Sequence, residues 1–515
     1  MRFVSAGPVW ACAAMLIGCS GAETSGTLGT SAIPAAGQTL TGKATPPGIR
    51  RTSDTAPCSA TGAGSFLANA AGNVAAELES SVLGGLNNTE CDPASAIGAG
   101  EFNVIHTTGG LFNFIGGGEH NSISSGSASS IGAGESNSIS GTNAMIGGGN
   151  ANRDSGVDAF IGGGESNNVT GTDAVIAAGS NNTGSGPAAF IGAGQFNTTD
   201  TGAQYGVVGG GFENYVGAVS ATVAGGYQNK VFNRYAFIGG GDGNTVNADF
   251  AVIAGGLNND VTGEGGYVAA GGYNFVSGTG AVIDGGFNNA AAGSYATVPG
   301  GYVNSASGTY SFAAGARASA AQNGTFVWSD GSDGDTILAS ARAYQFLARA
   351  SGGFTLWTNA ASTVGATLAP GSGTWSSTSD RNVKTDVVRV DESAVLDKVA
   401  RLPINRWSYI TEHGVRHVGP MAQDFYAAFG VGEDDKHITS IDEDGVALAA
   451  IKALHAENVQ LRTRLAAVTT SQAVLQSQIQ RLTAEWAQAR AGGWMSVRRP
   501  IRTIAPSEAR GRSVE

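Results

Sequence analysis

A fifteen-residue repeat constrains the fold of this chain more than any other feature of its sequence. The unit reads apolar–small–Gly–Gly–x–x–Asn, and its apolar position recurs from Val82 to Val298, mostly fifteen residues apart, with exceptions of 16, 17 and 18. An Asn follows each apolar position by six residues, from Asn88 to Asn304. A fixed period of this kind is the sequence signature of a solenoid or array. Fifteen residues are too few for a helix pair, so we expect one coil of two short strands and two turns.

Each residue type in the repeat suits a place in such a coil. The β-branched residue packs inward, and Gly permits a positive φ at the turn and close backbone approach. Asn tolerates the left-handed region and can hydrogen-bond within its own stack. Coils stack about 4.8 Å apart, so fifteen of them predict a rod ~70 Å long. Because one coil encloses very little core, we expect its apolar face to pack against other chains.

The composition favours a repeat array and excludes several other classes of protein. The 515 residues include 81 Gly, 42% hydrophobic residues and 13% charged residues, with a net charge of −12. Glycine without a three-residue period excludes collagen, and the hydrophobic content argues against disorder. From Val82 to Ala318 there are 4 Lys or Arg against 16 Asp or Glu, the reverse of what nucleic-acid binding needs.

Two kinds of small-ligand site are also disfavoured in the repeats. A calcium-binding β-roll would need a nine-residue period with a recurring Asp, and the repeat has neither. A phosphate loop would need a helix pattern after the Gly clusters, and none follows them. We therefore expect neither a metal nor a cofactor.

The repeat resembles the left-handed β-roll heads of trimeric autotransporter adhesins (YadA-like heads) over about 235 residues. This resemblance implies a mainly β fold, with a trimeric left-handed β-roll or solenoid head of 15-residue coils. It does not imply adhesion, because a fold does not fix a function.

The N-terminus has the pattern of a targeting segment. Arg2 supplies a minimal positive region, and residues 3–17 are mostly apolar or small. This stretch is shorter than the ~20 residues of a membrane span and suits a signal peptide. It ends in Leu16-Ile17-Gly18-Cys19, which resembles the bacterial lipoprotein processing box. The resemblance implies that Cys19 is lipidated, and Ser20 rather than Asp after it favours the outer membrane or cell surface of a bacterium.

Two further cysteines are candidates for a disulfide. Cys58 and Cys91 remain once Cys12 is removed with the signal peptide and Cys19 carries lipid. An exported protein lies in a compartment that permits disulfides. We expect a Cys58–Cys91 bridge at the N-terminal edge of the solenoid, with two independent thiols as the alternative.

The region after the repeats changes character. Residues 326–330 and 344–349 alternate as short strands do. Asp330, Asp333 and Asp335 cluster with two glycines, which fits either a metal loop or an acidic turn. We favour the acidic turn.

A motif near the C-terminus carries the chemistry. The stretch Ser379-Asp380-Arg381-Asn382-Val383-Lys384 is followed by His417-Val418-Gly419-Pro420-Met421-Ala422-Gln423 and then by a heptad helix. This order resembles the C-terminal intramolecular chaperone of phage tailspikes and endosialidases. The resemblance implies a homotrimer whose C-terminal domain cleaves its own chain at Thr378–Ser379. Ser379 would be the nucleophile and Lys384 the base.

Three other residues match positions of the motif and are candidates for supporting roles: Asp380, His417 and Gln423. His417 also fits a hydrogen-bonded core histidine. The dyad itself is chemically reasonable, because a Ser hydroxyl needs a neighbouring base to attack a carbonyl. A Lys, with a reference pKa of ~10.4, becomes a base only when burial lowers that value. A trimer interface would supply the burial, and the adjacent scissile bond would need no substrate pocket.

Apolar residues after Ala450 follow a heptad spacing over five heptads, which predicts a coiled coil. Asn458 and Gln472 occupy two of its core positions. The core positions filled by apolar residues are Ile451, Leu454, Leu461, Leu465, Val468, Leu475, Ile479, Leu482 and Trp486.

Together these patterns divide the chain into seven segments. They are a lipoprotein signal peptide (1–18), a flexible linker (19–80), the solenoid head (81–318), a β-rich neck (319–376), the self-cleaving chaperone domain (377–450), a coiled coil (451–489) and a disordered basic tail (490–515).

We predict a surface-anchored trimeric fibre held on the membrane by its N-terminal lipid, with one self-cleavage as its only enzymatic activity. The alternative is an adhesin or ligand-binding surface module with an unidentified extracellular ligand. A glycan-degrading tailspike would need a catalytic carboxylate pair, and the repeat Asp and Glu show no regular pairing.

Overall fold

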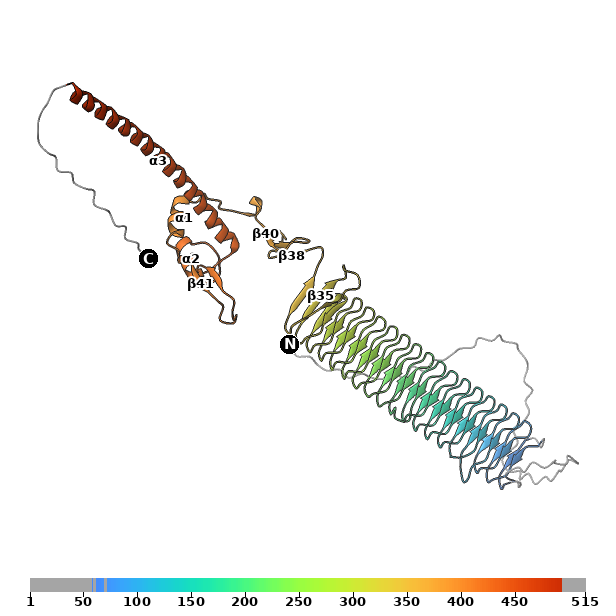
Figure 1. Ribbon diagram of the computed structural model, residues 1–515. Helices are drawn as coiled ribbons and strands as arrows, with labels where there is room; N and C mark the ends of the chain where they lie inside the picture. The colour runs from blue at the N-terminus through green and yellow to red at the C-terminus, as the bar shows by residue number, and fades with distance from the viewer. Residues whose placement is uncertain (1–57, 59–61, 69–71, 493–515) are drawn as a thin grey trace, which may run out of the picture. The chain divides into compact units, whose positions relative to one another are not determined.

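The computed structural model describes residue 58, residues 62–68 and residues 72–492, and it divides into two units between Ser351 and Gly352. Figure 1 shows the first unit as a stack of thin coils and the second as a set of short elements with one long helix. The predicted signal peptide, the lipidation site Cys19, most of the predicted linker and nearly all of the predicted tail lie outside the described residues.

The first unit is a parallel β-solenoid, as expected. Two columns of short strands run along it, and each strand pairs in parallel with the strand of the next coil, as Met145 does with Phe160 and Arg153 with Asn168. The odd-numbered strands form a 19-stranded sheet. Its strands are β1 (Phe66–Leu67), β3 (Ser81–Val82), β5 (Ala96–Ile97), β7 (Phe114–Ile115), β9 (Ser130–Ile131), β11 (Met145–Ile146), β13 (Phe160–Ile161), β15 (Val175–Ile176), β17 (Phe190–Ile191), β19 (Val207–Val208), β21 (Thr222–Val223), β23 (Phe237–Ile238), β25 (Val252–Ile253), β27 (Tyr267–Val268), β29 (Val282–Ile283), β31 (Thr297–Val298), β33 (Phe312–Ala316), β35 (Phe326–Asp330) and β37 (Phe346–Arg349).

The even-numbered strands form the second column. They are β2 (Val74–Ala75), β4 (Thr89–Glu90), β6 (Val104–Ile105), β8 (Ser122–Ile123), β10 (Ser138–Ile139), β12 (Arg153–Asp154), β14 (Asn168–Val169), β16 (Thr183–Gly184), β18 (Thr198–Thr199), β20 (Tyr215–Val216), β22 (Lys230–Val231), β24 (Thr245–Val246), β26 (Asp260–Val261), β28 (Phe275–Val276), β30 (Ala290–Ala291), β32 (Ser305–Ala306), β34 (Ala318–Ala320) and β36 (Leu338–Ala339).

The core of the solenoid lies between these two columns and closes within one chain. The second residue of nearly every two-residue strand points inward, so Ile161 of β13 and Val169 of β14 are both fully buried. The predicted inward position of the β-branched residue is confirmed. Each coil contributes two facing inward residues, and a single chain already shields both from water. The packing of an apolar face against other chains stays a prediction.

A ladder of buried asparagines stabilises the stack. The Nδ2 of Asn152 donates to the Oδ1 of Asn137 in the preceding coil at 3.0 Å, and its backbone N–H donates to the same oxygen at 3.1 Å. The Nδ2 also donates to the carbonyl of Gly164 in the next coil at 2.9 Å. Because buried polar groups must be paired, each Asn ties its coil to both neighbours, and the predicted stacking role is confirmed.

The left-handed backbone positions lie beside these asparagines rather than at them. The residue before the ladder Asn has positive φ, as in Ala151 at φ 57° and Tyr273 at φ 55°. The Gly three residues before the Asn is also left-handed, with Gly149 at φ 97°. A Cβ there would lie 2.1 Å from the carbonyl oxygen of Gly164 in the next coil. Glycine is required here by close coil stacking as well as by φ.

The solenoid extends past both predicted boundaries. At its N-terminal end, Phe66 of β1 already pairs with Ser81, and a disulfide joins Cys58 to Cys91. At its C-terminal end, β33, β35 and β37 continue the odd-numbered sheet into the segment predicted as a neck.

The acidic turn that follows β35 is neutralised by arginines. Arg317 lies 2.5 Å from Asp335, and Arg349 pairs with both Asp330 and Asp333. These ion pairs fit the acidic turn that we favoured over a metal loop.

The second unit is a small α+β region. Its strands are β38 (Phe354–Trp357), β39 (Gly365–Leu368) and β40 (Trp375–Ser377) in one antiparallel sheet, and β41 (Asn405–Trp407) and β42 (His417–Gly419) in another. Its helices are the 3₁₀ helix η1 (Arg381–Val383), α1 (Glu392–Val399), α2 (Ala422–Phe429) and α3 (Ser440–Ala491).

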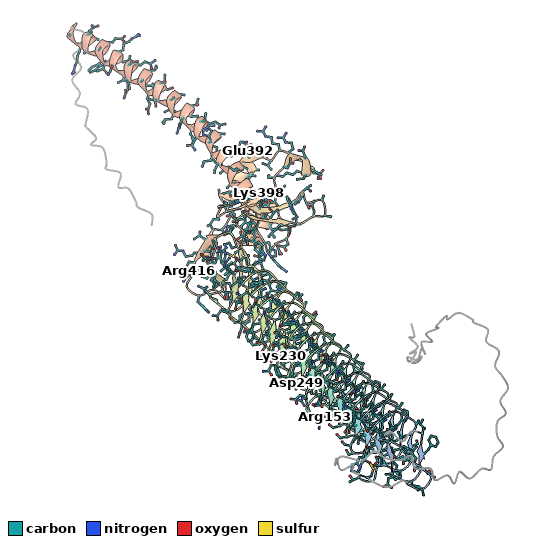
Figure 2. The ribbon with its side chains drawn as sticks, turned by 90° about the vertical axis from the view of Figure 1, so that its right-hand side faces the viewer. Arg153, Lys230, Asp249, Glu392, Lys398 and Arg416 are labelled. Carbon is teal, nitrogen blue, oxygen red and sulfur yellow. A yellow bond between two sulfur atoms is a disulfide. The ribbon has the colours of Figure 1, made fainter. Side chains whose placement is uncertain are left out.

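Helix α3 contains the predicted coiled-coil segment as one continuous helix of 52 residues. Its N-terminal turns pack against α1, where Glu392 pairs with Lys452, and Lys398 of α1 lies over the ring of Phe429 in α2 at 6.0 Å (Figure 2). In the described part of the chain no helix has both the length and the apolar character of a membrane span.

Candidate functional site

The candidate site is the turn that links β40 to η1. Thr378, just after β40, is held against Gly365 at the start of β39 by three hydrogen bonds. The backbone N–H of Thr378 donates to the Gly365 carbonyl at 2.9 Å, and its Oγ1 donates to the same carbonyl at 3.1 Å. The N–H of Gly365 donates back to Oγ1 at 3.2 Å. The residue on the N-terminal side of the predicted scissile bond is therefore fixed to the sheet.

Asp380 shapes the next step of the chain. It is the N-cap of η1, and its Oδ1 accepts hydrogen bonds from the backbone N–H of Asn382 at 2.9 Å and from the Asn382 side chain at 3.0 Å. Aspartate is a favoured N-cap because its carboxylate satisfies a donor that the helix leaves unpaired. Asp380 thus folds the backbone into a single tight turn.

That turn brings Lys384 back onto Ser379. Lys384 is the C-cap of η1, and its Nζ donates to the Ser379 Oγ at 2.6 Å. Both side chains are exposed in the single chain. The turn alone therefore brings two residues that are five positions apart into contact. The Lys384 amine touches the Ser379 hydroxyl beside the Thr378–Ser379 bond.

His417 belongs to a separate cluster. It pairs with Trp407 across β41 and β42, stacks on the Trp407 ring at 4.6 Å, and its Nε2 lies 2.9 Å from the Oε2 of Glu412. Tyr409 meets the same imidazole edge-on at 5.7 Å. This environment is that of a half-buried histidine held by an aromatic clamp and a carboxylate, and the hydrogen bonds described for His417 join it to neither Ser379 nor Lys384.

Gln423 lies exposed in the first turn of α2, two residues before the buried Phe425. The structure thus brings together Thr378, Ser379, Asp380 and Lys384, and it leaves His417 and Gln423 on other elements. Two partners were missed from the sequence. Gly365 anchors Thr378 through a sheet pairing that no local pattern signals, and Glu412 meets His417 across an irregular loop.

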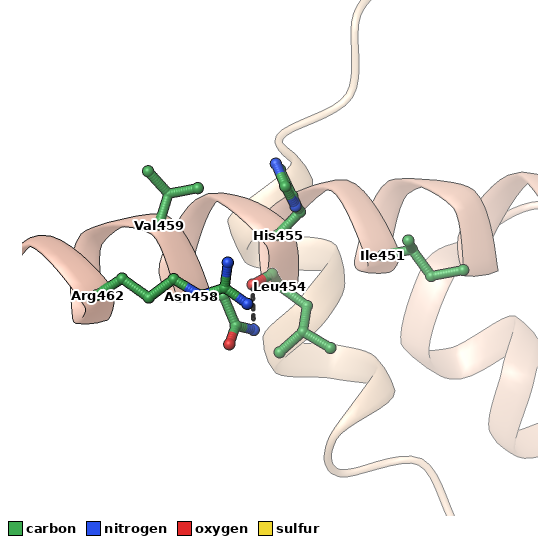
Figure 3. Close-up of a pocket in the computed structure, with 6 residues that line it drawn as sticks. All are labelled: Ile451, Leu454, His455, Asn458, Val459 and Arg462. Carbon is green, nitrogen blue, oxygen red and sulfur yellow. Dashed lines mark hydrogen bonds between the residues drawn. The ribbon is translucent and has the colours of Figure 1, made fainter.

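The heptad surface of α3 is the other functional feature of this unit. Its core-position residues are largely exposed, including Ile451 at 61% and Leu465 at 64%. Figure 3 shows the start of this surface, where a shallow depression of about 380 Å³ lies along Ile451, Leu454 and Asn458. The Asn458 side chain there donates to the Leu454 carbonyl at 2.9 Å. A regular row of exposed apolar residues on one helix is the surface that partner helices cover in a coiled coil.

The comparisons with known proteins agree with this geometry. Residues 379–431 match the Peptidase_S74 family, described as chaperone of endosialidase, and the match begins at Ser379 itself. No curated protein gave a match to the chain. The segment that starts at Ser379 and includes η1, α1, β41, β42 and α2 is therefore a chaperone-of-endosialidase domain, carried behind a parallel β-solenoid.

Proposed function

We propose that this chain is a subunit of a trimeric surface fibre, and that its C-terminal domain directs assembly and then releases itself by cutting the Thr378–Ser379 bond. The solenoid would be the lasting product, and the chaperone domain with α3 would be an assembly device. The observation that carries the proposal is the 2.6 Å contact between the Lys384 Nζ and the Ser379 Oγ at the first residue of the family match.

The reaction can be written with this chain's own groups and water. Lys384, as a neutral amine, accepts the Ser379 hydroxyl proton while Oγ attacks the carbonyl carbon of Thr378. The C–N bond to Ser379 breaks, and the departing nitrogen takes the proton back from Lys384. The resulting ester between Thr378 and the Ser379 Oγ is then hydrolysed by water, which leaves a carboxylate on Thr378 and a free amine on Ser379.

Two features of the site favour this step. The three hydrogen bonds between Thr378 and Gly365 hold the reacting carbonyl in a fixed place relative to the sheet. The nucleophile is the next residue along the chain, so no substrate has to be bound, and a fixed intramolecular geometry replaces a binding pocket.

The exposure of the site explains how cleavage would wait for assembly. A lysine in contact with bulk water keeps its proton and cannot accept another, whereas burial favours the neutral amine. In the single chain both Ser379 and Lys384 are exposed. Association of three chains around the exposed heptad surface of α3 would bury the dyad and switch the base on, so that only assembled chains cut themselves.

Anchoring at the cell surface is part of the same proposal and rests on Cys19. Its processing box, followed by Ser20, supports a lipid on the first mature residue and a position on the outer membrane. Three chains would then give the fibre three lipid anchors at one end.

The test is the identity of the released fragment. The wild-type chain should give a C-terminal fragment whose first residue is Ser379, read by N-terminal sequencing and intact mass. Ser379→Ala and Lys384→Met should stay full length, whereas Ser377→Ala, a neighbouring serine at the end of β40, should be cut like wild type. A fragment that begins elsewhere, or equal cleavage of Ser379→Ala, would contradict the proposal.

A further inference from the structure

The inside of the solenoid has a defect near the middle of its length. We call the inward residues of the even-numbered strands the even wall and those of the odd-numbered strands the odd wall. In the described structure the even wall from β6 to β28 consists of Ile and Val, except in three strands. Asp154, Gly184 and Thr199 are the inward residues of β12, β16 and β18. Only Val169 of β14 keeps an aliphatic side chain among these four neighbouring coils.

Each of the three exceptions weakens the even wall. The Oδ2 of Asp154 and the Oγ1 of Thr199 are buried and have no hydrogen-bond partner in the described structure. A buried polar atom without a partner is unfavourable, because it has lost its hydrogen bonds to water. Gly184 contributes no side chain, although a Cβ there would meet Ile176 and Val169 at ordinary contact distances of 3.4 and 3.6 Å. The even wall therefore lacks apolar contacts that its own backbone has room for.

The odd wall of the same four coils is intact. It consists of an Ile in every strand from β11 to β17, and each of these side chains is at most 1% exposed. The asparagine ladder also passes through these coils, as the Nδ2 of Asn182 donates to the Oδ1 of Asn167 at 3.0 Å. In a repeat array each coil depends on its own packing and on its two neighbours. The defect thus weakens one side of these coils and spares the other.

We propose that the even wall from β12 to β18 is a flank of the solenoid that opens locally, while the odd-numbered sheet and the asparagine ladder keep the coils in place. Segments with few buried apolar contacts open at a lower free energy than the rest of a protein. The hydrogen bonds that would break join the Thr170 N–H to the Gly184 carbonyl and the Ser185 N–H to the Thr199 carbonyl, both at 2.9 Å. This opening is independent of self-cleavage and assembly, because it follows from the interior of one chain.

Hydrogen exchange of the wild-type protein at single-residue resolution tests the proposal, since the odd wall of each coil serves as its reference. The Gly162 and Ala177 N–H groups make the corresponding bonds on the odd side of the same coils, also at 2.9 Å. After correction for intrinsic rates, we expect Thr170 and Ser185 to exchange at least tenfold faster than Gly162 and Ala177. Equal protection on the two sides would overturn the proposal.

A coil outside the defect supplies the control within the same experiment. Ser124 and Gly116 lie in one coil and make the same two kinds of bond, to the carbonyls of Ile139 and Ile131, each at 2.9 Å. Because the even wall there is aliphatic, their protection should be similar. If Ser124 also exchanged tenfold faster than Gly116, the even side would be weaker throughout, and the defect would not be the cause.

A repaired variant links the opening to the three residues. Asp154→Val, Gly184→Ala and Thr199→Val together should raise the protection of the even-side amides to that of the odd side. Thr183→Val with Thr198→Val changes the outward neighbours in β16 and β18, and should leave the fast exchange as it is in wild type. Fast exchange that persists in the repaired variant, or that is lost equally in the outward variant, would contradict the proposal.

Discussion

The Nζ of Lys384 lies 2.6 Å from the Oγ of Ser379, and yet both residues are open to solvent. The contact is made by local structure, because Asp380 caps a single 3₁₀ turn that returns the chain on itself. In the proposed reaction, the geometry of the dyad and the activation of its base are therefore separate requirements. The turn supplies the first in every copy of the chain, and only burial by partner chains would supply the second.

This separation predicts that cleavage depends on the coiled coil. Leu461→Asp with Leu475→Asp places charges at two core positions of α3 and should reduce the rate of self-cleavage at least tenfold, although Ser379 and Lys384 are unchanged. Thr463→Asp with Ser477→Asp, on the opposite side of the same helix turns, should cleave like wild type. The measurement is the time course of full-length chain on denaturing gels. Equal rates in the two variants would show that the dyad acts without assembly.

The solenoid core contains a carboxyl group that should make its stability depend on pH. Asp154 of β12 is fully buried between the inward Ile139 and Val169, and its Oδ2 has no partner in the described structure. Burial raises the pKa of Asp154 to about 7. The folded chain therefore keeps a proton that the unfolded chain loses near its reference pKa of about 4, and stability falls as pH rises from about 4 to 7.

We accordingly expect Asp154→Val to stabilise the solenoid by a few kcal/mol at pH 8 and by much less at pH 4, since the protonated carboxyl carries no charge to bury. Thermal unfolding at the two pH values measures the difference. Asp173→Asn changes an exposed turn carboxylate and should shift neither midpoint. A gain from Asp154→Val that is the same at both pH values would mean that packing, rather than ionisation, limits this coil.

The asparagine ladder should carry a large share of the stacking energy. Asn182→Ala removes the acceptor of the Asn197 backbone N–H and side chain, and it leaves the Gly194 carbonyl without its side-chain donor. Each buried group left unpaired costs about 1–3 kcal/mol, so the solenoid should lose several kcal/mol in denaturant unfolding. Thr183→Ala, the outward neighbour, should cost well under half as much; a similar loss would place the energy in the strand rather than in the ladder.

Much of this architecture could be predicted from periodicity. The spacing of Ile161, Ile176 and Ile191 predicts the register of the odd-numbered sheet, and the heptad spacing predicts α3. Both predictions need only apolar residues at a regular interval. The second inward column was not recognised, since its members include Asp154, Gly184 and Thr199 among the aliphatic residues.

The contacts of the candidate site, in contrast, could not be predicted from a repeating pattern. A five-residue spacing between Ser379 and Lys384 suggests a dyad only through resemblance, because the contact depends on an Asp380 cap that returns the backbone. The anchor at Gly365 comes from a strand pairing fourteen residues away along the chain from Ser379. Neither feature has a local sequence signal.

Membrane attachment is predicted to depend on Cys19. Cys19→Ser should move the protein from the membrane fraction to the soluble fraction, because three acyl anchors on one trimer bind almost permanently and their loss leaves none. Fractionation after detergent-free lysis decides the question, with Cys12→Ser inside the predicted signal peptide as the matched control. A Cys19→Ser protein that still pellets with membranes would reject the lipoprotein interpretation.

The last prediction concerns why assembly needs a chaperone domain that is later released. A chain truncated after Thr378 should give monomeric or aggregated solenoid, whereas wild-type protein that has already cut itself should stay trimeric. The two products have the same final sequence, so any difference between them is kinetic.

Each chain closes its own core, as the buried Ile161 and Val169 show, so a lone solenoid can fold but has nothing to set its register against two others. Many shifted pairings of identical coils would compete, because the repeat offers an equivalent contact every coil. Helix α3, aligned through its heptads, would remove these alternatives before the solenoids meet. Light scattering on the two preparations at equal concentration measures the outcome, and refolding the cleaved trimer from denaturant supplies the control, since it should then behave like the truncated chain. If the truncated chain forms trimers as readily as wild type, the solenoid assembles by itself and the chaperone role fails.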